Sequence, residues 1–531
     1  MINKKIRYFI LPLIAGLFIS TASFAQENLQ KIRINDFSGG MNSNYLADII
    51  SPNQGASMVN ITLNRKGRLE KRGGQALFAD DVGSTSHTGI GRFDPDANTS
   101  YMMIASGTNI ARATASVSSW VIINASDQLT SDKDTEFVQA NNLLFILNGH
   151  DSTSWHDGSR WTTASTYPTS PPTAKVGAWI ANYLFLAGNP DHRDWVYFSN
   201  NLEPEIFDAN DVFKVNTGDG QVIQNIQPFR EHELIIYKER SIFVYDISDT
   251  TLQPITISIG TIAPRSVVSL GNDQWFLSSE PIAVRSLVRT SFDKILTEEM
   301  SDAIQDIFDG SGYLTINKTY INKAAAVLFD DKYILAIATG VSTVNNTVVV
   351  YDFRAKAWYL IEGWYPVAWK VFDNRLFYID AYDGRVVECF VAQFADFNKG
   401  PEVNTEPTQP INFTYISRIH DFDNPENYKE ADALEVEFDP TGDYTATIFI
   451  NLDNNGWQNV GSINLAGNSL TLPITLPSQL RNSGVSRQTF HLSQYGEFKK
   501  IQIMVQQQGK DQDCILQRAT IFGRIKPWRR E

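Results

Sequence analysis

A short pattern recurs between residues 90 and 390: an apolar run, a turn of polar residues, and a second apolar run. Its clearest copies are spaced 40 to 58 residues apart, and a degenerate further copy begins near residue 94. Repeats of roughly 40–50 residues that hold several short strands are typical of β-propeller blades. The sequence therefore predicts an all-β fold, with a propeller of six to seven blades over residues 85–397. The turn residues of the six clear copies are Asn142, Asn182, His232, Asp273, Asp331 and Asn374.

Length and composition agree with a large β protein. A chain of 531 residues is too long for one ordinary core, which leaves several domains or a repeat array. Hydrophobic residues make up 43% and aromatic residues 12%, and the aromatic share favours strands. The two cysteines, Cys389 and Cys514, exclude a disulfide framework and a cysteine-based metal site.

The first 25 residues have the pattern of a secretory signal. Three cations precede an apolar run over residues 8–20, and Ser23-Phe24-Ala25 has the small-x-small form of a cleavage site. We expect export and cleavage before Gln26 from this pattern. The apolar run is about 13 residues, too short to span a bilayer comfortably, and no other stretch is suited to stable membrane insertion.

The chain is acidic. Its formal net charge is −14, and removal of the first 25 residues takes away three cations and no acids, giving −17. Such a body is not suited to hold nucleic acid phosphates over a broad surface.

The regions outside the repeats suggest additional elements. Residues 26–84 form an N-terminal segment in which Ser51-Pro52 predicts a short helix and Lys66-Gly67 predicts the tip of a basic hairpin. Another helix is predicted over 296–308, ending at Gly310. A polar, proline-bearing linker at 398–412 precedes strictly alternating strands, which predict an antiparallel β-sandwich over 413–531.

Catalytic motifs are missing from the sequence. The seven histidines form no close metal-binding pair, although His150 and His156 share a predicted loop. The cluster Asp191-His192-Arg193-Asp194 could be an acid/base set or a sugar-binding loop, or simply a solvated hairpin turn. Asn451–Gly456 begins like a calcium loop, but Ser462 stands where the bidentate Glu belongs. The sequence therefore predicts no catalytic, cofactor or metal site, and a protein that is not an enzyme.

Several motifs occur in a fixed order along almost the whole chain. Asp36-Phe37-Ser38-Gly39-Gly40 with Asn42 comes first, followed by Asn60, Gly67, Leu69, Lys71, Arg72 and Gly74. Trp195–Ser199, Gly218-Asp219-Gly220, Ile235–Ile242, Ile262–Val267 and Asn346–Asp352 follow. In this order the chain resembles the tail hub or nozzle proteins of short-tailed bacteriophages.

The resemblance implies a structural virion protein built on a β-propeller with an added β domain. It implies a hexameric ring of copies below the portal and adaptor, in contact with other tail proteins. Double-stranded DNA would pass through that ring without sequence recognition, being retained and then released at infection. The cations of the hairpin and of the C-terminus are candidate docking residues for an acidic neighbouring ring: Arg65, Lys66, Arg68, Lys71, Arg72, Arg529 and Arg530.

The secretory pattern departs from this family, because phage tail proteins assemble in the cytoplasm. The alternative hypothesis is an exported periplasmic or cell-surface propeller that binds a glycan or a protein partner. A third hypothesis is a secreted glycosidase-like hydrolase that uses Asp191 or Asp194.

Overall fold

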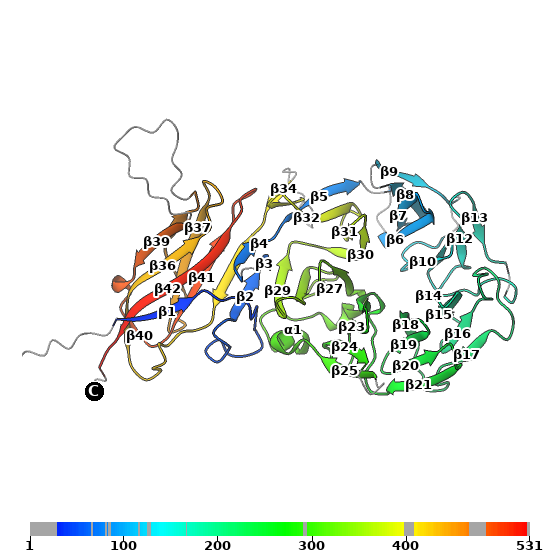
Figure 1. Cartoon of the computed structure of the whole chain (residues 1–531), viewed down its shortest axis with the longest axis horizontal. Helices are drawn as coiled ribbons and strands as arrows, with labels where there is room; N and C mark the ends of the chain where they lie inside the picture. Colours follow the sequence, from blue (N-terminus) through cyan, green and yellow to red (C-terminus); the bar gives the residue numbers. More distant parts are fainter. Residues whose placement is uncertain are drawn as a thin grey trace, which may run out of the picture.

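The computed structural model describes residues 29–64, 67–79, 82, 87–114, 117–124, 129–165, 167–289, 295–397, 408–466 and 485–527. The fold is almost entirely β. Figure 1 shows a propeller on one side and, beside it, a second region that we call the β domain. The secretory pattern at residues 1–25 lies outside the described residues.

The propeller consists of antiparallel four-stranded blades, as predicted. Four are continuous in sequence: β6–β9 (His87–Asp96, Thr99–Ser106, Asn109–Thr114, Val117–Ile122), β10–β13 (Glu136–Ala140, Leu143–Leu147, Ser154–His156, Trp161–Thr163), β14–β17 (Val176–Ile180, Tyr183–Ala187, Trp195–Phe198, Val212–Lys214) and β18–β21 (Ile223–Phe229, Glu233–Lys238, Ile242–Asp246, Thr251–Thr256). A fifth is β22–β25 (Val268–Leu270, Asp273–Leu277, Val284–Arg289, Ile295–Glu299).

The sixth separate blade is closed by a strand from near the N-terminus. It contains β30 (Pro366–Phe372), β31 (Arg375–Asp380), β32 (Val386–Val391) and, outermost, β5 (Gly74–Ala79). β5 pairs antiparallel with β32. This blade therefore joins the two ends of the propeller sequence and closes the ring.

The strands β26 (Ala325–Phe329), β27 (Lys332–Ile337), β28 (Thr347–Asp352) and β29 (Ala357–Glu362) form one further four-stranded group. Its innermost strand, β26, contacts β22 on one side and β30 on the other. The innermost strands then follow one another around a closed ring, β6, β10, β14, β18, β22, β26 and β30, with β30 in contact with β6. The group β26–β29 thus takes the seventh place in the propeller.

Each recurring sequence pattern forms the inner hairpin of a blade. Three of these hairpins turn through two consecutive residues of positive φ: Ala181-Asn182, Asp330-Asp331 and Asp373-Asn374. Two-residue turns of this kind match the twist of the flanking strands, and Asn and Asp tolerate positive φ. The repeated Asn and Asp of the sequence are therefore turn residues.

The β domain contains two sheets assembled from both ends of the chain. One sheet has the order β3-β4-β42-β36-β39, with β1 on β42 and β40 on β36. The other continues the propeller group through β29-β2-β35-β41-β37-β38 and so belongs to a nine-stranded sheet. The strands are β1 (Gln30–Ile34), β2 (Gly55–Val59), β3 (Ile61–Leu63), β4 (Leu69–Lys71), β35 (Phe413–Ser417), β36 (Lys429–Phe438), β37 (Thr445–Leu452), β38 (Trp457–Asn464), β39 (Ser486–His491), β40 (Glu497–Phe498), β41 (Ile501–Gln507) and β42 (Ile515–Ile525).

The predicted boundaries 26–84 and 413–531 imply two separate units. In the sheet topology, however, strands of the N-terminal segment and of the C-terminal residues share the same two sheets. Side chains from both sheets, such as Val436 of β36 and Ile450 of β37, belong to one buried cluster that extends into β27–β29. Part of the predicted linker forms β34 (Thr408–Pro410), which pairs with β33 (Ala395–Phe397). Residues 398–407 lie outside the described residues.

Both helix predictions need correction. The residues after Ser51-Pro52 form a turn and then β2, because pairing with β35 overrides the local preference. In the second segment, β25 occupies 295–299, a short 3₁₀ helix η2 (Asp302–Ile304) follows, and only α1 (Gln305–Asp309) is α-helical before the left-handed Gly310. No helix within the described ranges has the length and apolar character needed to cross a membrane.

Candidate functional site: the domain junction and the propeller axis

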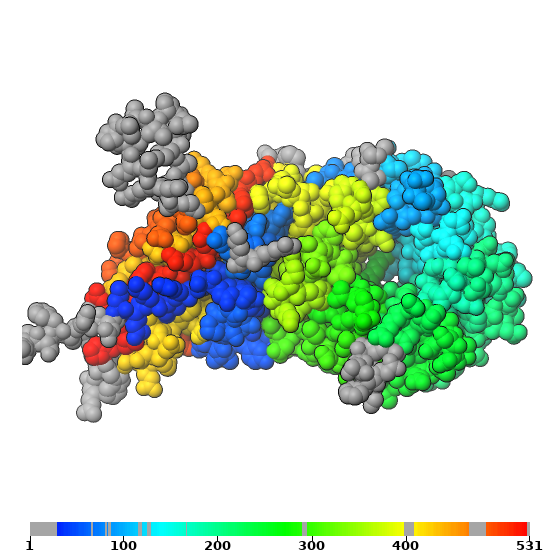
Figure 2. All heavy atoms as spheres, viewed as in Figure 1, coloured from blue at the N-terminus to red at the C-terminus, as the bar shows by residue number. Residues whose placement is uncertain are grey.

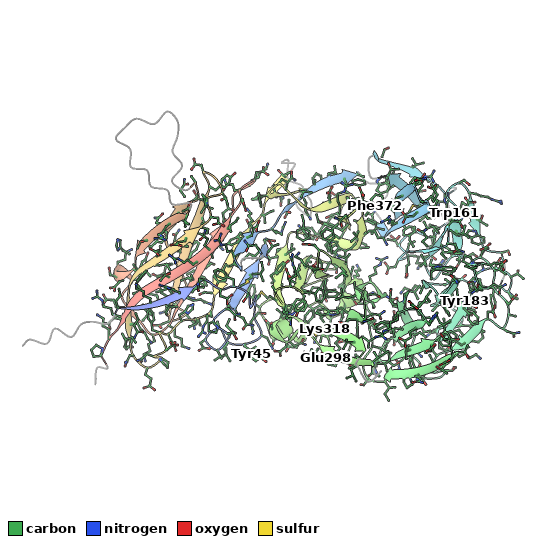
Figure 3. The ribbon with its side chains drawn as sticks, in the orientation of Figure 1. Tyr45, Trp161, Tyr183, Glu298, Lys318 and Phe372 are labelled. Carbon is green, nitrogen blue, oxygen red and sulfur yellow. The ribbon has the colours of Figure 1, made fainter. Side chains whose placement is uncertain are left out.

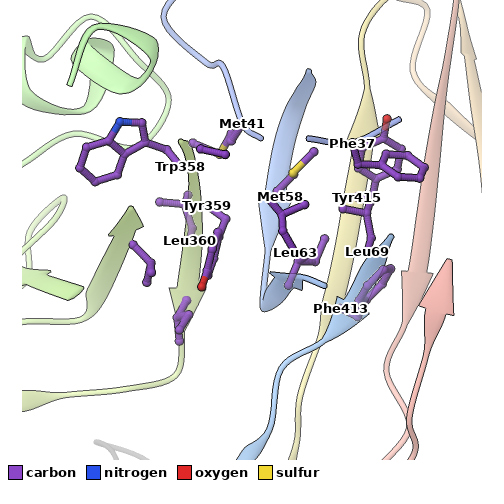
Figure 4. Close-up of a cluster of buried hydrophobic side chains, with 14 of the residues drawn as sticks. Phe37, Met41, Met58, Leu63, Leu69, Trp358, Tyr359, Leu360, Phe413 and Tyr415 are labelled. Carbon is purple, nitrogen blue, oxygen red and sulfur yellow. The ribbon is translucent and has the colours of Figure 1, made fainter. Parts of the chain in front are cut away.

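The motif residues near the N-terminus gather between the propeller and the β domain. Phe37 is buried and packs edge-on against Tyr415 of β35, with ring centroids 5.3 Å apart. The amide of Met41 donates to the carbonyl of Trp358 in β29 at 2.8 Å. Figure 4 shows Phe37, Met41, Trp358 and Tyr415 in this cluster, with strands of both regions on either side.

Gly40 occupies a position at this junction that other residues do not fit. Its φ is +65°, and an added Cβ would lie 2.6 Å from Cβ of Ala357 and 2.8 Å from the carbonyl oxygen of Trp358. The glycine therefore provides both a left-handed turn and a close approach to β29. The adjoining loop, which carries the Tyr45 labelled in Figure 3, also reaches the propeller, because the Tyr45 hydroxyl donates to Asp302 at 3.2 Å.

Arg72 is fully buried and ties three segments together. Its two Nη atoms bind both carboxylate oxygens of Asp396 in β33, at 2.8 and 2.5 Å. Its Nε donates to Asn60 Oδ1 at 2.9 Å, and Nη2 also donates to the Glu362 carbonyl at 3.1 Å. The guanidinium lies 4.7 Å from the ring centroid of Trp364. A bidentate pair with these further hydrogen bonds is the arrangement that a buried Arg requires.

Lys71 is the buried neighbour on the other face of β4. Its Nζ donates to Gln507 Oε1 at 2.6 Å and to the Gly509 carbonyl at 3.0 Å. Burial lowers the pKa of Lys71 to about 8, partly offset by the nearby Cys514. The Lys-Arg dipeptide of the motif therefore stabilises the junction.

These positions change the set of candidate docking residues. The hairpin itself exists, as β3 paired with β4, and Arg68 forms a part-buried ion pair with Asp439 at 2.5 Å. Lys71 and Arg72 are enclosed, and buried side chains cannot bind a neighbouring ring, so both leave the set. Arg68 stays a candidate, and the other four lie outside the described residues: Arg65, Lys66, Arg529 and Arg530.

The propeller axis contains a small polar cavity of about 230 Å³, lined by the innermost strands of the blades. The centre of the propeller is visibly hollowed in Figure 2. Arg265, which precedes β22, crosses this space: its Nη2 donates to the carbonyls of Thr88 and Thr135 on the opposite side of the ring. Its Nη1 lies 3.4 Å from Asp134. The cavity is smaller than the roughly 300–1,000 Å³ of small-molecule sites and cannot admit a DNA duplex.

Two ionisable side chains inside the axis have shifted pKa values. Burial raises the pKa of Glu136 to about 7, against the opposing effects of the Gly177 amide and of Arg265. Burial, together with Arg92, lowers the pKa of Lys370. Both shifts follow from desolvation, which disfavours a charged form.

The other ionisable clusters of the sequence form turns. His150 Nδ1 lies 3.1 Å from Asp151, whose side chain accepts hydrogen bonds from Thr130. In the Asp191–Asp194 loop, the Asn189 side chain caps the backbone, and His192 stacks on Trp195 with ring centroids 3.8 Å apart. Across the described part of the chain, no three His, Cys, Asp or Glu side chains are placed to hold a metal ion.

Sequence reasoning named Arg72 only as a candidate docking residue and missed its buried pairing, and it gave Arg265 no role. Arg72 and Asp396 are 324 residues apart in sequence, so no local pattern could pair them. Arg265 belongs to the quoted stretch 262–267, but nothing in that stretch indicates a side chain that crosses the ring.

Comparisons with known proteins find weak structural similarity and no related sequence. No family model matches the chain, and no curated protein matches it. Among solved structures, the extracellular domain of a putative hybrid two component system from B. thetaiotaomicron is 9% identical, with a TM-score of 0.44, over 61% of this chain and 40% of that one. BamB from Moraxella catarrhalis is 13% identical, with a TM-score of 0.40, over 68% of this chain and 98% of that one. YCF48 from Cyanidioschyzon merolae is 10% identical, with a TM-score of 0.40, over 60% of this chain and 98% of that one.

Proposed function

We propose that this protein is a non-enzymatic structural subunit of a phage tail hub or nozzle, which works by assembling into a ring around DNA. One observation carries the proposal: the N-terminal motif residues that resemble this family converge on the junction between propeller and β domain. Gly40, Leu69, Lys71 and Arg72 are all buried or crowded there. A shared motif that builds a junction is an architectural feature, which suits a subunit with a mechanical role.

The DNA path in this proposal lies between copies of the chain. The axis of a single propeller is narrow and crossed by Arg265, so a duplex cannot use it. A hexameric ring would surround a wider lumen, and subunits with a net charge of −14 would repel duplex phosphates without sequence preference. Portal, adaptor and other tail proteins are the neighbours that this role requires.

Electron microscopy and native mass spectrometry of the purified protein test the proposal. We expect a closed ring with a central hole, and a mass six times that of the chain. A monomer at every protein concentration, including in the presence of the portal complex encoded with it, would contradict the proposal.

Charge reversal tests the docking part. Changing Arg65, Lys66 and Arg68 to Glu should weaken the binding of the ring to the portal complex by at least tenfold. The control reverses Lys214, an exposed cation on the outer strand β17. Equal binding by the two variants would show that the hairpin does not dock.

The second candidate function is an exported propeller that binds a glycan or a protein partner, favoured by the secretory pattern of residues 1–25. N-terminal sequencing of the native protein separates the two candidates. A chain that begins at Gln26 and is recovered as a monomer from a periplasmic extract supports export; an intact N-terminus in purified virions supports the tail hub.

A further inference from the structure

A second and larger cavity opens at one mouth of the propeller axis. Its volume is about 580 Å³, within the range of small-molecule sites. The loops that enter the innermost strands of several blades form its wall, together with the loops after β11 and β15. The function proposed above assigns no role to this cavity.

The cavity is cationic in an otherwise acidic chain. Four cations line it, against two carboxylates: Lys133, Lys175, Arg265 and Lys323 against Asp132 and Asp134. Asp134 is paired with Arg265. Neither Lys133 nor Lys175 has a carboxylate within ion-pair distance in the parts of the chain that the structure describes. Lys175 lies within electrostatic range of Glu136 in the axis, but neither lysine is ion-paired, and two such lysines in a concave site favour an anionic ligand.

The backbone fixes Lys175 in place. Its amide donates to the Ala187 carbonyl at 2.9 Å, and the preceding carbonyl accepts from the Gly149 amide at 2.8 Å. Gly149 and Gly188 hold positive φ, and an added Cβ at either would lie within 2.9 Å of Lys175 Cβ. The stem of Lys175 is therefore enclosed between equivalent loops of two neighbouring blades. A charge held in this way loses little freedom when a ligand binds.

Asn345 supplies an independent sign of a ligand. The side chain is 2% exposed and lines the same cavity. Its Nδ2 donates to the carbonyls of Lys323 and Pro366, both at 2.8 Å, which fixes the amide orientation. Its Oδ1 accepts no hydrogen bond from any described residue. A buried acceptor without a donor is destabilising, so a donor from a ligand would be stabilising.

We propose that the mouth of the propeller binds an acidic sugar, a ligand that carries a carboxylate beside hydroxyl groups. The carboxylate meets Lys175 and Lys133, and a hydroxyl donates to Asn345 Oδ1. Charge-assisted hydrogen bonds from fixed donors are the strong contacts of such sites. A neutral sugar leaves both lysines without an ion-pair partner, and an anion without a hydroxyl leaves Asn345 without a donor.

Titration calorimetry with sodium glucuronate, glucose, acetate and inorganic phosphate tests the proposal on the full chain. We expect glucuronate to bind at least tenfold more tightly than glucose or acetate, and its affinity to fall when salt rises from 50 to 200 mM. Phosphate binding as tight as that of glucuronate would show a general anion site and overturn the sugar assignment. Binding of none of the four ligands, or equal binding of glucose, would overturn the proposal.

Three variants locate the site. Lys175→Gln should weaken glucuronate binding about tenfold, whereas Lys214→Gln removes the same charge from an exposed outer strand and should leave binding unchanged. Asp132→Asn removes a repelling carboxylate and should strengthen binding, and Asn tolerates the φ of +63° at this position. Unfolding cannot produce the gain in affinity that is expected for Asp132→Asn. The proposal therefore remains testable even if the Lys175→Gln variant does not fold. Unchanged affinity in both variants would contradict it, whatever the oligomeric state.

Discussion

The propeller and the β domain are built in opposite ways from the same kind of strand. Most blades take their four strands from one continuous stretch, as β10–β13 do within residues 136–163. In the β domain, β1 pairs with β42 and β2 pairs with β35, so neighbours in the sheet come from opposite ends of the chain. Local pairing leaves a repeating pattern in the sequence, whereas pairing between the chain ends leaves none.

The boundary between the two regions is therefore where a single side chain matters most. The nine-stranded sheet and one buried cluster extend across it, and Arg72 with Asp396 fills its polar centre. Substitutions on either side of the boundary test whether the two regions behave as one body or as two.

The largest effect is expected from Arg72→Met. It leaves the Asp396 carboxylate buried without its cation, which typically costs 3–5 kcal/mol of unfolding free energy, to be measured by urea denaturation. Arg240→Met is the control, because Arg240 and Glu280 form an exposed pair, 65% and 67% exposed. We expect the control to cost under about 1 kcal/mol. Similar losses in both variants would show that the junction does not depend on Arg72.

Acidification should change the free energy of unfolding in opposite directions through one ionisable group in each region. In the β domain, burial lowers the pKa of His420 from 6.5 to about 3, so below pH 6.5 only the unfolded chain takes up this proton and stability falls. In the propeller axis, the pKa of Glu136 is raised from 4.5 to about 7, so the folded chain holds this proton more firmly and stability rises as the pH falls from 7.

Between pH 7 and pH 5, each group should change the free energy of unfolding by about 2 kcal/mol. The two changes have opposite signs and nearly cancel. Urea denaturation at both pH values measures them against the wild-type chain. His420→Gln should gain stability on acidification relative to wild type, and Glu136→Gln should lose it. Variants that keep the wild-type pH dependence would show that neither side chain affects how stability changes with pH.

The smallest effect on stability is expected when alanine replaces two glycines, one with close neighbours and one without. Gly40 and Gly67 have similar positive φ, +65° and +71°, but only Gly40 has atoms close to an added Cβ. Alanine at Gly67 should cost about 1 kcal/mol for its backbone conformation, and alanine at Gly40 about 1 kcal/mol more for crowding against β29. Thermal unfolding of both variants checks this order, and an equal loss would mean that the junction yields to accommodate the methyl group.

The sequence was sufficient to predict the propeller because its signal is local. The turns at Asn182, Asp331 and Asn374 have the positive φ that Asn and Asp tolerate, and the flanking apolar runs form the inner hairpins. The closing strand β5 was not predicted, because nothing in residues 74–79 indicates a partner at 386–391.

The wrong predictions share one physical origin. The residues after Ser51-Pro52 and those at 295–299 have weak local preferences, and distant strands decide their conformation. The cations of the basic hairpin were placed on the surface because charge normally stays in water. Lys71 and Arg72 are the exceptions that carbonyl, amide and carboxylate partners make possible, and most of those partners lie hundreds of residues away.

The pairing of β5 with β32 also sets an order of events during synthesis. Residues 74–79 leave the ribosome early, yet their partner strand emerges only after the rest of the propeller has been translated. In a nascent chain the propeller can therefore close only after β32 has been translated, while most of the β domain is still to be made.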